Sequence, residues 1–149
     1  MIKQFRVLLA LESEQKNKAI QQVLDEFYVV QVARDAEEVY SIIHQFQPDL
    51  AVLDYSLTNI NPIELHEGIE FLHPHTKFVI CVTNENLEIA KRIWLHRSID
   101  YIRKPIGDDH IIDDINKLVR HILDQREIKG LQEQINRLKD ENEKLRKLL

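Results

Sequence analysis

Five short apolar segments alternate with longer amphipathic segments along the first 125 residues, and this alternation constrains the fold more than any other feature of the chain. The apolar segments have the length of strands and occupy residues 7–10, 28–32, 50–53, 77–82 and 101–103. The segments between and after them predict helices at residues 15–27, 35–46, 62–71 and 84–96, and one that begins near residue 108. Parallel strands need crossover connections, and strands covered on both faces are almost continuously apolar. We therefore expect an α/β fold, a doubly wound five-stranded parallel sheet with helices on both faces.

Two of the predicted helices carry enough apolar residues to assign an inner face. For residues 15–27 we expect this face to consist of Ala19, Ile20, Val23, Leu24 and Phe27. Asp35 is a suitable N-cap for the next helix, because its side chain can accept a hydrogen bond from the first turn. The inner face of that helix is expected to consist of Ala36, Val39, Tyr40, Ile43 and Phe46.

The end of the chain has a heptad repeat instead of this pattern. Its a positions are Ile128, Ile135, Asn142 and Leu149, and its d positions are Leu131, Leu138 and Leu145. Isoleucine at a with leucine at d favours two parallel helices, and a single asparagine at a fixes their register. We therefore expect a domain at residues 1–124 and a coiled-coil dimerisation helix at residues 125–149, which continues the last helix of the domain and forms a parallel homodimer. The alternative is a single amphipathic helix that packs on its own domain.

Charge and cysteine content exclude several classes of function. Residues 126–149 carry seven Lys and Arg against five Asp and Glu, which leaves 13 against 20 in residues 1–125. Residues 1–125 are therefore acidic, and an acidic domain binds nucleic acid phosphates poorly. No basic region precedes the heptad repeat. No apolar run approaches the roughly 20 residues that cross a bilayer. A single cysteine, Cys81, cannot form an internal disulfide. We expect a cytoplasmic protein.

Chemistry is expected where the predicted strands end, because ligands of parallel α/β sheets bind at the carboxyl ends of the strands. Glu12, Asp54, Thr83 and Lys104 follow or end four of these strands. An aspartate, a hydroxyl and a lysine at one edge suit phosphoryl chemistry, because the carboxylate can act as nucleophile or metal ligand and the lysine can neutralise charge. Each residue alone is a weak signal. Their joint occurrence favours a functional site.

The segments PDLAVLDYSLTNINPIEL, KFVICVTNEN and SIDYIRKPI resemble the receiver domain of two-component response regulators, over about residues 3–124. The resemblance implies the flavodoxin-like receiver fold. It also implies that Asp54 accepts a phosphoryl group from a histidine kinase or a phosphotransfer protein. It implies that Thr83 and Lys104 bind the phosphoryl oxygens, and that Tyr101 changes its side-chain rotamer on activation. A domain of this family is a signalling module and not an enzyme.

The resemblance also implies a Mg²⁺ site formed by Glu12, Asp54 and the backbone carbonyl of Ser56. Receivers usually carry two acids directly after the first strand, whereas this chain has Leu11 and Glu12. One carboxylate is therefore lost and the other is one methylene longer than aspartate. Because Mg²⁺ requires near-ideal octahedral oxygen geometry, this departure predicts weakened binding.

Two alternative functions follow from these residues. One is a phosphorylation-independent pseudo-receiver that acts as an interaction and dimerisation scaffold, which Leu11 favours. The other is a small phosphatase of the haloacid-dehalogenase type, which normally needs a second acid at the position of Ser56 and a cap domain. A receiver followed by a coiled coil is also how longer transcriptional activators begin, so the tail is either the output itself or a linker to an effector domain.

Overall fold

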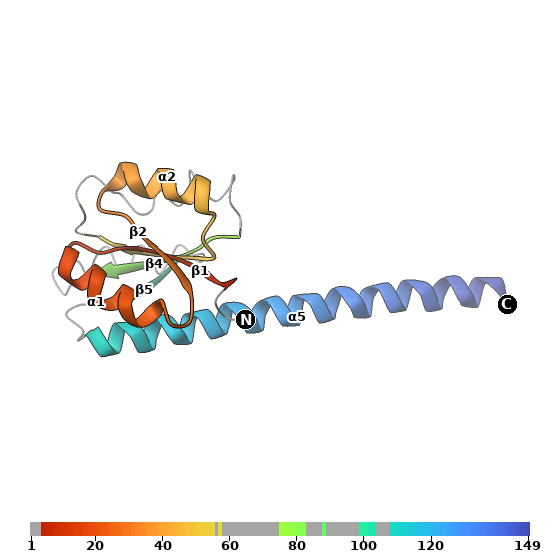
Figure 1. The fold of residues 1–149 in the computed structure, drawn as a ribbon. Coiled ribbons are helices and arrows are strands. Elements are labelled where there is room, and N and C mark those ends of the chain that lie inside the picture. Colours follow the sequence, from red (N-terminus) through yellow and green to blue (C-terminus); the bar gives the residue numbers. More distant parts are fainter. Residues whose placement is uncertain (1–3, 56, 58–74, 83–87, 89–98, 104–107) are drawn as a thin grey trace. The chain divides into compact units, whose positions relative to one another are not determined.

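A computed structural model describes residues 4–55, 57, 75–82, 88, 99–103 and 108–149. Its strands are β1 (Arg6–Ala10), β2 (Val29–Val32), β3 (Leu50–Asp54), β4 (Lys77–Val82) and β5 (Ile99–Arg103). They form one parallel sheet in the order β2-β1-β3-β4-β5 (Figure 1). The predicted fold class is confirmed. The helix predicted at residues 62–71 lies outside the described residues, and of the helix predicted at residues 84–96 the structure describes residue 88 alone, which is helical.

Helices α1 (Glu14–Leu24) and α2 (Ala36–Phe46) cover opposite faces of the sheet (Figure 1). Side chains alternate between the two faces of a strand. Leu8 and Ala10 of β1 therefore belong to a buried cluster that includes Val39 and Ile43 of α2. Their neighbour Leu9 points to the other face and is equally buried. Burial on both faces explains why these strands are continuously apolar.

The inner face of α1 differs from the prediction. Its buried residues are Asn17, Ile20 and Leu24, whereas the predicted Ala19, Val23 and Phe27 are exposed. The helix ends at Leu24, with Asp25 as its C-cap, so Phe27 lies beyond it. Positions i, i+3 and i+7 share one face of a helix, and here the first of them is occupied by an amide. A search for apolar residues alone passes over it.

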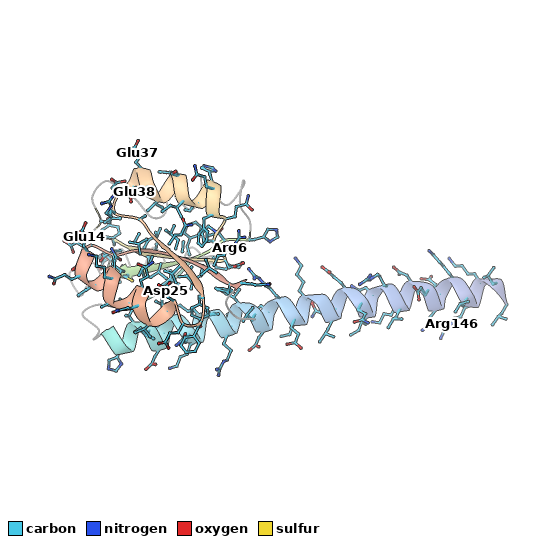
Figure 2. All side chains as sticks on the ribbon, in the orientation of Figure 1. Arg6, Glu14, Asp25, Glu37, Glu38 and Arg146 are labelled. Atoms are coloured by element: carbon cyan, nitrogen blue, oxygen red, sulfur yellow. The ribbon has the colours of Figure 1, made fainter. Side chains whose placement is uncertain are left out.

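Helix α2 matches its predicted bounds, with one error on its inner face: Tyr40 is 44% exposed, and Ile42 is half-buried instead. Asp35 is the N-cap, as predicted, and its carboxylate accepts from the Glu38 backbone N–H at 2.8 Å. The Glu38 carboxylate in turn accepts from the Arg34 backbone N–H at 2.9 Å and from its guanidinium at 3.1 Å. These bonds lower the pKa of Glu38 below its ordinary value. Figure 2 shows Glu37 and Glu38 at this end of the helix, where the helix dipole favours negative charge.

The other end of α2 is joined to the start of β1. Gln47 closes the helix in the left-handed conformation, with φ 51°. The Arg6 guanidinium donates to the Phe46 carbonyl at 2.8 Å, and the Arg6 backbone N–H donates to the Asp49 carboxylate at 2.8 Å. Terminal carbonyls of a helix lack partners within the helix, and a cation there stabilises the helix dipole. These contacts fix the edge of the sheet opposite Asp54.

The last helix, α5 (Asp108–Leu148), begins where the sequence predicted. The chain divides into two compact units, Met1–Ile112 and Asp113–Leu149, so α5 belongs to both. Its buried apolar residues are Ile111, Ile115, Val119 and Ile122. Val119 is buried, whereas its neighbour Leu118 is half-buried. The predicted division at residue 124 stays a prediction.

Candidate functional site

Asp54 is the last residue of β3 and is only 1% exposed. β3 is the central strand of the sheet, with β1 and β4 on either side. Leu53 is in register with Ala10 at the end of β1, and Asp54 is in register with Cys81 of β4. The carboxylate therefore lies at the carboxyl edge of the sheet, where the sequence predicted chemistry. A buried carboxylate requires hydrogen bonds or a cation as compensation.

The loop that follows β1 supplies one of these hydrogen bonds. The backbone N–H of Glu12 donates to Oδ2 of Asp54 at 3.2 Å. The backbone of Glu12 is thus in contact with Asp54, although the two residues lie 42 positions apart in the chain. Glu12 itself is exposed. The pair comprises one buried carboxylate and one carboxylate that solvent reaches.

Leu11 is a core residue and is 2% exposed. Its backbone is held by Asn17: the Leu11 N–H donates to Oδ1 of Asn17 at 3.0 Å, and Nδ2 of Asn17 donates to the Leu11 carbonyl at 3.1 Å. The side chain that stands in place of an acid therefore belongs to the apolar interior. Sequence reasoning missed Asn17. The available signal was its spacing from Ile20 and Leu24 on α1.

The remaining predicted site residues are described in part or not at all. Thr83, Lys104 and Ser56 lie outside the described residues. The strands that lead to the first two are in place: β4 ends at Val82, directly before Thr83, and β5 ends at Arg103, directly before Lys104. The backbone of Tyr101 lies in β5, in register with Ile80.

Two of the described residues at this edge of the sheet carry a carboxylate, Glu12 and Asp54. Nowhere in the described part of the chain do three or more His, Cys, Asp or Glu side chains gather into a metal-binding group. Mg²⁺ is commonly bound by one or two carboxylates and keeps several waters. Glu12 and Asp54 therefore fit a weak Mg²⁺ site.

The predicted coiled-coil seam is an exposed apolar stripe on α5. Ile128, Leu131, Ile135, Leu138 and Leu145 are between 47% and 58% exposed, and Leu149 is fully exposed. Asn142 is exposed as well. Large apolar residues that recur along one face of a helix usually mark an interaction surface. None of the described helices is both long enough and apolar enough to span a membrane.

Comparison with known proteins gives a family match over most of the chain. Residues 7–116 match the family model described as the response regulator receiver domain. The transcriptional regulatory protein HptR of Staphylococcus aureus (strain NCTC 8325 / PS 47) is 25% identical over 130 residues, which are 85% of this chain and 51% of that protein. The response regulatory protein SERP2406 of Staphylococcus epidermidis is 27% identical over 99 residues, which are 66% of this chain and 39% of that protein. The chain thus spans about half the length, or less, of these curated relatives.

Solved structures agree with the fold. A CheY-like response regulator receiver domain protein from Methanospirillum hungatei JF-1 superposes with a TM-score of 0.66 at 24% identity, covering 81% of this chain and 98% of that one. NtrX from Brucella abortus superposes with a TM-score of 0.72 at 24% identity, covering 85% of this chain and 29% of that one. At this level of identity, the likeness concerns the fold.

Proposed function

The chain belongs to the family of response regulator receiver domains, which act in two-component signalling, and from this membership we propose that Asp54 accepts a phosphoryl group from a histidine kinase or a phosphotransfer protein in the cytoplasm. The observation that carries the proposal is the position of Asp54. It ends the central strand, is 1% exposed and accepts the Glu12 N–H. The chain is then a substrate of its partner and not an enzyme.

In the proposed transfer, a carboxylate oxygen of Asp54 forms a bond to phosphorus while the phosphorus–nitrogen bond of the donor phosphohistidine breaks. The electron pair of that bond stays on the imidazole nitrogen, and the product is an acyl phosphate. Thr83 would donate a hydrogen bond to a phosphoryl oxygen, and Lys104 would neutralise its charge. Tyr101 would then carry the change towards α5. The strand ends directly before Thr83 and Lys104 support these roles.

Glu12, Asp54 and the backbone carbonyl of Ser56 would hold Mg²⁺, which when bound neutralises charge between the carboxylate and the incoming phosphoryl group. The contact between the Glu12 backbone and the Asp54 carboxylate, which brings the two acidic residues to one edge of the sheet, supports this assignment. Residue 11 is a buried leucine and supplies no third carboxylate, which favours weak binding of Mg²⁺.

The proposed output is a parallel homodimer through the heptad residues of α5. Half-exposed isoleucines and leucines on one face support this proposal, because a second copy would cover them. Charge supports the parallel arrangement, because it brings Glu141 at g near Arg146 at the partner's following e position. Asn142 at a also meets its counterpart only in the parallel register.

A pseudo-receiver that has kept the fold and lost the phosphoryl transfer is the second candidate. The observation that favours it is Leu11, which is 2% exposed at a position where receivers usually carry an acid. In this case the dimer is the function, and Asp54 is a structural residue that binds the Glu12 backbone.

Intact mass after incubation with acetyl phosphate separates the two candidates. We expect one phosphoryl group on the wild-type chain with Mg²⁺, none on Asp54→Ala, and none when a chelator removes the metal. Acetyl phosphate supplies the phosphoryl group without a kinase, so the result does not depend on identifying the partner. No adduct under any condition would support the pseudo-receiver.

A further inference from the structure

Asn17 is a buried polar residue in the part of α1 that lies next to the candidate site. It is 3% exposed, and an amide buried to this extent is costly unless its polar atoms form hydrogen bonds. Both of its side-chain hydrogen bonds go to Leu11: Oδ1 accepts from the Leu11 N–H at 3.0 Å, and Nδ2 donates to the Leu11 carbonyl at 3.1 Å. The Asn17 side chain thus binds the backbone of one residue, Leu11, which directly follows β1.

The start of α1 does not require this side chain. Ser13 is the N-cap, and its hydroxyl accepts from the Lys16 N–H at 3.4 Å. The first turn is closed by the Asn17 backbone N–H, which donates to the Ser13 carbonyl at 3.0 Å. The amide of Asn17 is therefore available to orient the loop, and its two bonds determine how residue 11 leaves the strand.

The bond from Asn17 to the Leu11 carbonyl acts on Asp54 through one peptide group. The Leu11 carbonyl and the Glu12 N–H belong to the same planar peptide unit and point in opposite directions. Asn17 holds the carbonyl side at 3.1 Å, and Asp54 accepts from the N–H side at 3.2 Å. Hydrogen bonds joined in this way polarise one another. A rotation of the peptide would break both bonds together.

We propose that Asn17 is a positioning residue for the phosphorylation of Asp54: its amide fixes the peptide between Leu11 and Glu12, so that the Glu12 N–H stays on the Asp54 carboxylate. The inference rests on the proposed function of Asp54. In the unphosphorylated protein Asn17 holds this peptide in place whether or not phosphoryl transfer occurs.

Two substitutions separate the two hydrogen bonds of Asn17. Asn17→Asp keeps an acceptor for the Leu11 N–H and loses the donor to the Leu11 carbonyl, whereas Asn17→Leu loses both. Ile20→Val is the matched control, because Ile20 lies on the same buried face of α1 and is 1% exposed. For each chain we would measure hydrogen exchange of the Leu11 and Glu12 amides by NMR and the rate of Asp54 phosphorylation by acetyl phosphate with Mg²⁺.

We expect Asn17→Asp to speed exchange of the Glu12 amide and to slow phosphorylation, each by about tenfold, while the Leu11 amide stays protected. Asn17→Leu should expose both amides to exchange, and Ile20→Val should change neither amide relative to the rest of α1. If Asn17→Asp matches Ile20→Val in both measurements, the inference is wrong. If the wild-type chain takes up no phosphoryl group, the proposed function fails, and the exchange pattern alone then decides whether Asn17 holds the peptide.

Discussion

Leu11 and Glu12 are neighbours in the chain with opposite surroundings, since one is 2% exposed and the other lies at the surface. Because residue 11 is a leucine and not an acid, the candidate site has one negative charge fewer than receivers usually have. One carboxylate fewer beside Asp54 means less repulsion to overcome when a phosphoryl group arrives, and also weaker attraction for the cation that would assist the transfer. The side chain of residue 11 therefore influences both the repulsion of the phosphoryl group and the attraction of the cation.

Leu11→Asp should therefore tighten Mg²⁺ binding while lowering stability. The backbone bonds to Asn17 do not depend on the side chain of residue 11, so the loop can keep its path. We expect a loss of about 3 kcal/mol in the free energy of unfolding, because a carboxylate replaces a buried leucine. Added Mg²⁺ should restore part of this loss, by binding the folded state.

Thermal unfolding with and without Mg²⁺ measures both effects. Ile20→Asp is the control, because it places a carboxylate at a buried position of α1 that is not next to another predicted ligand. Mg²⁺ should stabilise Leu11→Asp more than wild type, and Ile20→Asp no more than wild type. Equal stabilisation of Leu11→Asp and wild type would contradict the assignment of a cation site to this edge of the sheet.

The sequence predicted Asp54 and Glu12 because both follow from one rule, that the ends of parallel strands meet at one edge. Asn17 does not follow from that rule. Its role depends on a backbone carbonyl and a backbone N–H, which every residue carries, and on the path of a loop that hydrophobic periodicity does not encode. The only trace in the sequence is its place three residues before Ile20 and seven before Leu24.

At the scale of elements, strands were predicted closely, and the faces of helices less well. β4 has its predicted bounds, because both faces of the strand are covered and the apolar run is unbroken. In α1 the apolar residues Val23 and Phe27 are 40% and 47% exposed. An apolar side chain at the surface is common in soluble proteins, so periodicity alone assigns a face with less certainty than it assigns a helix.

Helix α5 contains a glycine in its second half. Gly130 is in the helix interior, and a Cβ built on it meets nothing within 4 Å. Gly130→Ala should therefore stabilise the surrounding helix by about 1 kcal/mol without a clash. Backbone amides near residue 130 should exchange about fivefold more slowly. Glu133→Ala, at an exposed position one turn further, is the control and should have little effect. Faster exchange of these amides in Gly130→Ala would contradict a continuous helix through residue 130.

At the scale of the whole molecule, the charge pattern of α5 defines where the pairing of the two helices in the proposed dimer begins. Continuing the heptad back from Ile128 places Asp124 at d and His121 at a, and one heptad earlier it places Lys117 at d and Asp114 at a. In a parallel homodimer Asp114, Lys117 and Asp124 would each face a like charge on the second copy, which is unfavourable. We expect the two helices to pair from about residue 127 onwards and to separate before it.

Disulfide trapping tests this limit in a Cys81→Ser background, which removes the native thiol. Leu138→Cys and Leu145→Cys, both at d, should cross-link readily to the same residue of a second copy, and Asp124→Cys should not. Cross-linking of Asp124→Cys as fast as the other two would contradict the limit. Failure of Leu145→Cys to cross-link would contradict the parallel register.

The central claim is a dimer whose chains accept a phosphoryl group on Asp54, and native mass spectrometry after treatment with acetyl phosphate and Mg²⁺ tests both halves of it in one spectrum. We predict a dimer that carries up to one phosphoryl group per chain, and an unmodified dimer for Asp54→Ala. A monomer without any adduct would contradict the account.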